Sequence, residues 1–108
     1  MSNDLATVTE RIIVLLDQIE RGEFPDREGL ESTLTDGYAC ALWVDAECDR
    51  IERRLAERAA QLSEESGEEH TRQISALARL LDRRRRELAS LRSLLAGVRS
   101  GAQAARVA

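Results

Sequence analysis

Hydrophobic residues recur every three or four positions along most of the chain, which is the spacing of one face of an α-helix. The clearest series lies between residues 68 and 98, where seven of eight positions at a 3.5-residue repeat are apolar. The eight positions are Ile74, Leu77, Leu81, Arg84, Leu88, Leu91, Leu95 and Val98. The series predicts a long helix over residues 68–98 that packs along a partner helix.

A second amphipathic series predicts a helix over residues 26–65. Seven of its nine positions are apolar when small Ala and Cys are counted, and the nine are Leu34, Gly37, Ala41, Val44, Cys48, Ile51, Leu55, Arg58 and Leu62. Gly29 and Gly37 weaken the first turns, because a glycine costs about 1 kcal/mol relative to alanine inside a helix. A start as late as Ser32 is therefore an alternative.

A shorter helix is predicted over residues 4–21. Its apolar stripe consists of Leu5, Val8, Ile12, Leu15 and Ile19. Asn3 or Asp4 can cap its start, because a short side-chain oxygen accepts a hydrogen bond from the free amides of the first turn. Gly22 is a suitable stop, and Pro25 confirms the break.

A short polar turn, SEESGEEH, separates the two long helices, so they should fold back on each other in antiparallel fashion with the bend at Ser66–Gly67. The fold predicted is all-α, a short N-terminal helix plus a long, coiled-coil-like antiparallel helical hairpin. Residues 1–100 should form a single domain. Residues 101–108 have no apolar stripe to bury and are expected to fray.

The segment from Tyr38 to Cys48, YACALWVDAEC, is apolar on nearly every side. A helix of that kind must be covered nearly all round, and three helices do not easily supply enough neighbours. We therefore expect an interface, formed by Tyr38, Ala39, Leu42, Trp43 and Ala46. A second copy of the chain is the favoured partner, giving a dimeric bundle. The alternatives are another protein, or the first helix lying over Tyr38 and Leu42.

Composition fits this picture, because 43% of the residues are apolar, 33% charged and only 3% aromatic, a profile typical of helix bundles. All 16 cationic residues are arginine, which excludes Schiff-base and other lysine chemistry. Residues 1–49 carry 12 acids and 3 arginines, and residues 50–108 carry 8 acids and 13 arginines. We expect the acidic part to pack beside the basic part.

The run Arg83, Arg84, Arg85, Arg86 is a possible anion contact, since arginine binds phosphates in a bidentate manner. A nucleic-acid-binding regulator is therefore an alternative function. The favoured interpretation is that these arginines pair with acids of the preceding helix, and no nucleic acid is expected as a partner. Those acids are Asp45, Glu47, Asp49 and Glu52.

Two acidic pairs define a third, less favoured function. Glu28 and Glu31 form E-x-x-E, and Asp49 and Glu52 follow on the same predicted helix. This resembles the magnesium-binding arrangement of all-α nucleotide pyrophosphohydrolases, in which paired carboxylates on two helices hold a metal and a pyrophosphate. The second element here is D-x-x-E, where that family has E-x-x-D.

Other catalytic or cofactor-binding signals are weak, and no cofactor or metal is expected. The single histidine, His70, falls at the predicted bend. Cys40 and Cys48 are eight residues apart on one helix, about 12 Å along its axis, which is too far for a disulfide between them. Cys48 falls in the core seam, and Cys40 is expected to be the more exposed thiol.

The start of the chain is polar and acidic, and its longest apolar run, Ile12 to Leu16, is too short to span a bilayer. We expect a cytoplasmic protein with reduced cysteines and no membrane partner. The function that fits best is a non-enzymatic protein-protein interaction module, such as an adaptor, a small chaperone or a regulator.

Overall fold

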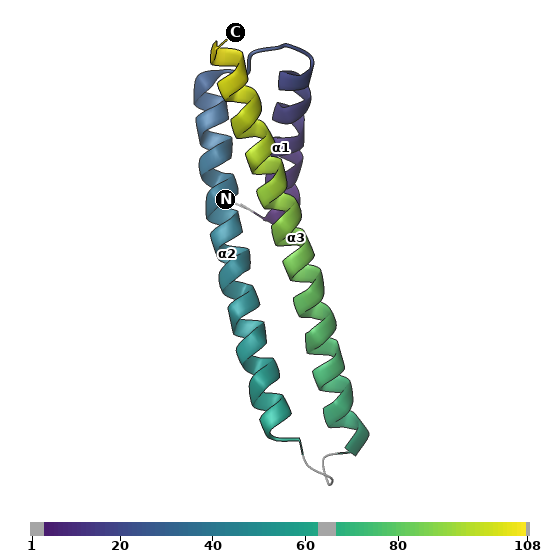
Figure 1. Ribbon diagram of the computed structural model, residues 1–108. Coiled ribbons are helices and arrows are strands. Elements are labelled where there is room, and N and C mark those ends of the chain that lie inside the picture. Colours follow the sequence, from purple (N-terminus) through teal and green to yellow (C-terminus); the bar gives the residue numbers. More distant parts are fainter. Residues whose placement is uncertain (1–3, 63–66, 108) are drawn as a thin grey trace. The chain divides into compact units, whose positions relative to one another are not determined.

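The computed structural model describes residues 4–62 and 67–107, which form three α-helices (Figure 1). Helix α1 spans Leu5–Glu20, α2 spans Arg27–Ala60 and α3 spans Gly67–Val107. The described part of the chain is 91% helical and contains no strand, which confirms the all-α class. Within these same ranges, no helix is long and apolar enough to cross a membrane.

Helix α1 begins and ends where its local chemistry predicts. The Asp4 carboxylate accepts a hydrogen bond of 2.7 Å from the backbone amide of Thr7, which satisfies one of the free donors of the first turn. After the last turn, Gly22 adopts a φ of 77°, a conformation that glycine reaches without a steric penalty. Asp4 is therefore confirmed as the cap.

Helix α2 is continuous through both of its early glycines. Asp26 starts it, accepting from the amide of Gly29 at 3.3 Å through its side chain and from the amide of Leu30 at 2.8 Å through its carbonyl. The expected end near Glu65 is wrong, because the helix stops at Ala60. Most of the expected bend, residues 63–66, lies outside the described residues.

A histidine caps the end of α2. Nε2 of His70 lies 2.7 Å from the carbonyl oxygen of Arg58, one of the last carbonyls of that helix. Since a carbonyl can only accept, His70 donates from Nε2. Helix α2 thus gains a partner for a carbonyl that no intrahelical amide reaches.

Helix α3 is longer than its apolar series predicts, and it continues from Val98 to Val107. The expected fraying of residues 101–108 is wrong for residues 101–107, and Ala108 lies outside the described residues. A Cβ atom placed on Gly101 would lie 2.6 Å from Cγ2 of Ile19. The small residues of this segment thus bring α3 close to α1, and the close packing compensates for the missing large side chains.

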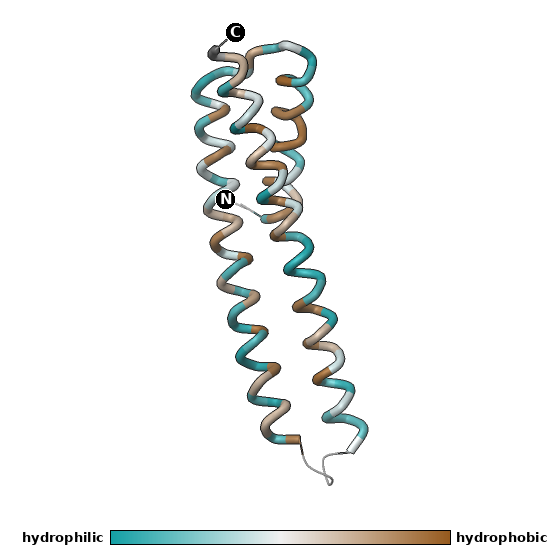
Figure 2. The backbone as a smooth tube through the Cα atoms, viewed as in Figure 1, coloured by the Kyte–Doolittle hydropathy of each residue, from teal (hydrophilic) through white to brown (hydrophobic). Residues whose placement is uncertain are grey.

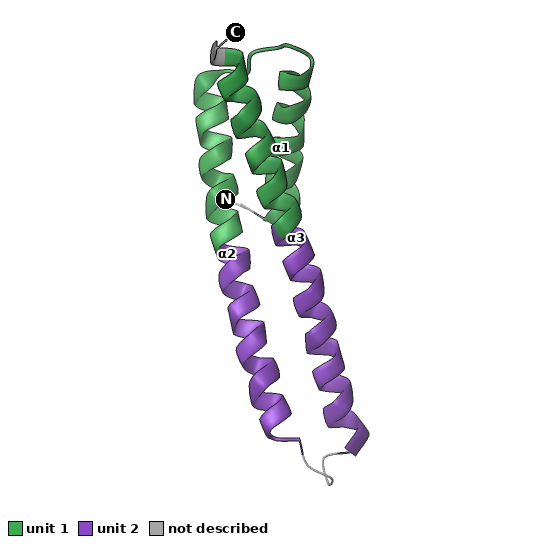
Figure 3. Cartoon of the chain, in the orientation of Figure 1, with its two compact units in different colours: residues 1–42, 89–108 green, residues 43–88 purple. Residues whose placement is uncertain are grey.

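The chain divides into two compact units (Figure 3). Unit 1 comprises Met1–Leu42 and Ala89–Ala108, and unit 2 comprises Trp43–Leu88. The single domain expected over residues 1–100 stays a prediction.

Unit 1 packs three helix segments around Val8, Ile12, Leu91, Leu95 and Val98, which are at most 2% exposed. Gly37 belongs to the same core. A Cβ atom at this position would lie 2.5 Å from Cδ2 of Leu95 and 3.2 Å from Cδ1 of Ile12. The absence of a side chain at Gly37 therefore allows all three helices to approach one another closely.

Unit 2 pairs two helix segments, and Figure 2 shows hydrophobic residues recurring along them between longer hydrophilic stretches. Glu47 contacts Arg84, whereas Arg58 contacts Gln73. The two segments therefore run in opposite directions within this unit. The buried residues include the expected seam positions Val44, Cys48, Ile51, Leu81 and Leu88.

Candidate interaction site

One side of α2 carries a cluster of exposed apolar side chains. Leu42 is 69% exposed, Trp43 56% and Tyr38 40%. Ala39 and Ala46 are also exposed. These five residues, called here the α2 patch, recur at helical spacing on one side of a single helix. The opposite side of the same turns is buried, through Ala41, Val44 and Cys48.

Within unit 1, helix α1 does not cover Tyr38 or Leu42, which are 40% and 69% exposed. It contacts α2 on another side, where Arg11 pairs with Asp36 at 2.8 Å and donates to the hydroxyl of Thr33 at 3.2 Å. Thr33 is only 6% exposed although it is polar. The alternative in which the first helix packs over Tyr38 and Leu42 is therefore wrong.

Cys40 is buried, with 4% of its surface exposed, so the expectation that it is the more exposed thiol is wrong. It lies two turns after Thr33 on the same side of α2, the side that faces α1. The three-helix packing of unit 1 buries a wider arc of α2 than a two-helix hairpin would, and this arc includes Cys40.

Cys48 lies in the seam of unit 2, as its position in the repeat predicts, and is 5% exposed. Burial raises the pKa of the Cys48 thiol, and the nearby acids Asp45, Glu47 and Asp49 raise it further, while Arg85 opposes them. A thiol with a raised pKa is mostly protonated near neutral pH and is a poor nucleophile. Its role in the structure is that of a small packing residue.

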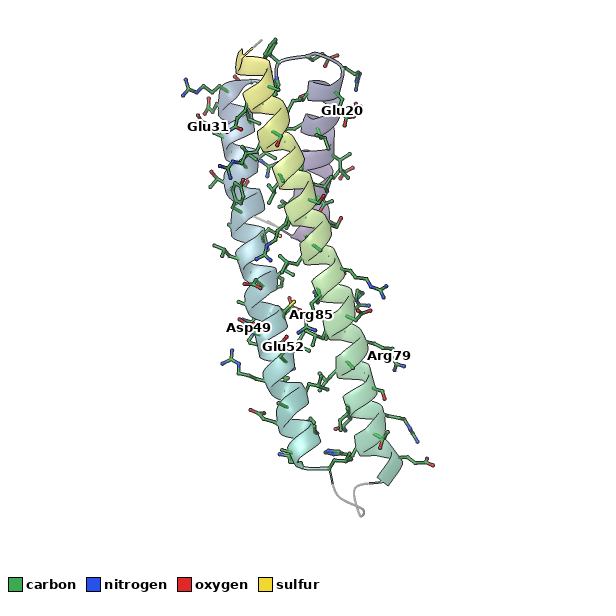
Figure 4. The ribbon with its side chains drawn as sticks, viewed as in Figure 1. Glu20, Glu31, Asp49, Glu52, Arg79 and Arg85 are labelled. Atoms are coloured by element: carbon green, nitrogen blue, oxygen red, sulfur yellow. The ribbon has the colours of Figure 1, made fainter. Side chains whose placement is uncertain are left out.

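The arginine run lies on α3 within unit 2, and two of its members reach across to α2. Nε of Arg84 lies 3.1 Å from Glu47, and Nη1 lies 2.8 Å from Glu87 of its own helix. Arg85 pairs with Glu52 (Figure 4). The hydrogen bond to Glu87 raises the pKa of Arg84 more strongly than its partial burial lowers it. The predicted pairing of the arginine run with Glu47 and Glu52 is thus observed. Arg84 lies in the seam between α2 and α3.

The other two arginines of the run pair along α3 itself. Arg83 lies 3.9 Å from Glu87, and Arg86 lies 2.8 Å from Asp82. Both are exposed, so each pair contributes at most about 0.5 kcal/mol. All four guanidinium groups already have a carboxylate neighbour, and a phosphate bound to this run would have to compete with those carboxylates.

The structure does not bring the two acidic pairs together. Glu31 and Asp49 both belong to one helix, α2, and not to two facing helices. Glu31 pairs with Arg27 at 3.1 Å, and Glu52 pairs with Arg85. No group of three or more potential metal-ligating side chains occurs in residues 4–62 and 67–107. The two-helix metal clamp of the pyrophosphohydrolases is therefore not formed within the described chain.

Unit 1 has a hollow of about 660 Å³ at one end, which the sequence does not predict. It lies where the α1–α2 loop and the last turns of α3 meet. Its lining includes Ile19, Phe24, Pro25, Leu30, Gly101 and Ala105. Phe24 is 74% exposed, and an aromatic residue beside a proline in a loop is the only sequence signal for this feature. The hollow could not be predicted because the last turns of α3 were expected to fray.

No protein-family model matches this chain, and neither the curated proteins nor the solved structures contain a match to it.

Proposed function

We propose that this protein is a non-enzymatic helical interaction module that self-associates through the α2 patch. In this proposal α2 and α3 form one long antiparallel hairpin, α1 packs beside one end of it, and a second copy of the chain covers the patch. The assembled bundle then acts as an adaptor, a small chaperone or a regulator.

The exposure of the α2 patch is the observation that supports this proposal most directly. Leu42, Trp43 and Tyr38 lie within two helical turns and are 69%, 56% and 40% exposed. Fully burying a large apolar side chain stabilises a complex by about 1.5–3 kcal/mol before the costs of association. Tyr and Trp are enriched among the residues that contribute most of the binding energy at protein interfaces.

The surroundings of the patch favour a helix as its partner. Ala39 and Ala46 flank Leu42 and Trp43, and small residues allow a second helix to approach closely. The side of α2 that carries the patch continues into exposed charged residues of both signs, Glu31 before it and Arg53 after it. Such charges set orientation and exclude wrong partners more than they add affinity.

Replacing Trp43 by glutamate tests the proposal. A charge at the centre of the patch would have to be desolvated on association, so the Trp43→Glu variant is expected to be monomeric at concentrations where the wild-type chain is a dimer. Light scattering on a sizing column measures the mass. Circular dichroism checks that the variant keeps its helices.

Leu62→Glu is the matched control, because Leu62 is also exposed, at 50%, and lies on the described chain after the end of α2. It is expected to leave the mass unchanged. If Trp43→Glu keeps its helix content and has the same mass as the wild type, the α2 patch is not the association surface and the proposal is wrong.

A further inference from the structure

One side of α2 carries exposed residues at equal spacings before and after Leu42. Going outward in both directions, positions four, seven, eleven and fourteen residues from Leu42 return to the same side of a helix with 3.6 residues per turn. Before Leu42 these positions are Tyr38, Thr35, Glu31 and Glu28. After it they are Ala46, Asp49, Arg53 and Ala56. All eight residues are exposed in the structure.

The residues of this series are complementary when α2 packs against an antiparallel copy of itself. Tyr38 then lies opposite the small Ala46 of the partner subunit. Thr35 can donate its hydroxyl hydrogen to the partner's Asp49, and Glu31 meets the partner's Arg53. The central Leu42 meets the partner's Leu42, and every other contact occurs twice, as a two-fold axis requires.

We infer that two copies of this chain associate through antiparallel α2 helices, with the two-fold axis passing beside Leu42. The inference deepens the proposed function and rests on it. Along the helix, Glu31 and Arg53 lie about 16 Å on either side of Leu42, so the ion pairs close both ends of an apolar centre. Trp43 lies one residue from the axis, next to the partner's Trp43.

The charge pattern selects the antiparallel orientation over the parallel one. In a parallel two-fold pair each residue faces its own copy, so Glu31 would meet Glu31 and Arg53 would meet Arg53. Like charges facing each other destabilise such an assembly and are a common device against a wrong orientation. Glu31 is available for the antiparallel pair, because its contact with Arg27 is a surface pair with the Glu31 side chain 63% exposed.

Cysteine cross-linking tests the orientation. The variants Thr35→Cys and Asp49→Cys each add one exposed thiol to the exposed side of α2. The wild-type chain is the control, because its own thiols, Cys40 and Cys48, are buried. After mild oxidation, a mixture of the two variants is expected to give the 35–49 cross-link, and either variant alone is not. Self-cross-linking of each variant alone would indicate parallel helices and overturn the inference.

Charge reversal tests the register. Glu31→Arg or Arg53→Glu alone is expected to raise the dimer dissociation constant about tenfold, because each change places two like-charged pairs in the dimer. The double variant Glu31→Arg/Arg53→Glu should return to within about twofold of the wild type. Glu28→Arg is the matched control, one turn away and opposite the partner's Ala56, and should change the constant little.

The two proposals fail in different ways. If Trp43→Glu abolishes the dimer but the double reversal does not restore affinity, the α2 patch is the interface and the inferred register is wrong. If none of the changes along α2 affects the mass of the assembly, the proposed function itself is wrong. Cross-linking and sedimentation on the same preparations distinguish these outcomes.

Discussion

Gly37 shows how one missing side chain determines the packing of three helices. It lies mid-helix, where glycine costs about 1 kcal/mol relative to alanine, yet its backbone is in close contact with Leu95 and Ile12. The heptad series of α2 predicts Gly37 as a core position. The series cannot predict that the position must be glycine, because that follows from the distance to α1 and α3.

Gly37→Ala is expected to lower the free energy of unfolding by about 1–3 kcal/mol, because an added methyl group would lie 2.5 Å from Leu95 and over-pack the core. Gly29→Ala is the control in the same helix. Its added methyl group would lie 3.8 Å from Asp26, an ordinary contact, so it should be neutral or stabilising by up to about 1 kcal/mol. Urea unfolding of both variants measures the difference, and equal effects would contradict the close packing at Gly37.

Cys48 gives the protein a stability that depends on pH in the alkaline range. Since burial raises the pKa of its thiol, the unfolded chain loses this proton at lower pH than the folded chain does. The free energy of unfolding should therefore fall as the pH rises past about 8.5, where an unperturbed thiol ionises. With no lysine in the sequence, few other groups titrate there.

Comparing the wild type with Cys48→Ala isolates this effect, because Cys40 is present in both. We expect the wild type to lose more stability between pH 7.5 and 9.5 than the variant, as measured by urea unfolding at each pH. The same loss in both proteins would show that the Cys48 thiol ionises alike in the folded and unfolded states.

At the scale of the helices, the heptad repeat predicts the seam of unit 2 well. Val44, Cys48 and Ile51 on α2 are buried, as are Leu81 and Leu88 on α3. The end of α3 could not be predicted in this way. Gly97 and Gly101 lie against Leu16 and Ile19 of α1, so the contact is made by backbone approach and leaves no stripe of large apolar residues to detect.

The ion pair between α2 and α3 is partly buried, since the side chains of Arg84 and Glu47 are 25% and 18% exposed. The second carboxylate oxygen of Glu47, Oε2, is buried and has no hydrogen-bond partner among the described residues. Removing the arginine should therefore leave an uncompensated carboxylate. Arg84→Leu is expected to destabilise the protein by about 1–3 kcal/mol.

The double variant Arg84→Leu/Glu47→Leu is the test of that explanation. Replacing a buried pair by apolar residues is often neutral, so most of the lost stability should return. Thermal or urea unfolding of the single and double variants gives the coupling. A double variant no more stable than Arg84→Leu would show that the arginine acts through packing and not through its charge.

At the scale of the whole molecule, the sequence predicts the number and order of the helices and the exposed residues of the α2 patch. The alternative with the first helix over Tyr38 and Leu42 is wrong, and the apolar spacing of α2 could not exclude it because that spacing does not reveal which side α1 covers. The contact of Arg11 with Thr33 and Asp36 decides this, and it joins residues far apart in the sequence.

Light scattering over a range of concentrations, with reductant present, measures the solution mass of the wild-type chain and so shows whether the chain dimerises. One chain has a mass of 12.1 kDa. Self-association through the α2 patch predicts a mass of twice that value, falling toward that of the monomer only on strong dilution. A mass of one chain at every concentration would show that the α2 patch does not bind a second copy, and would contradict the proposed function.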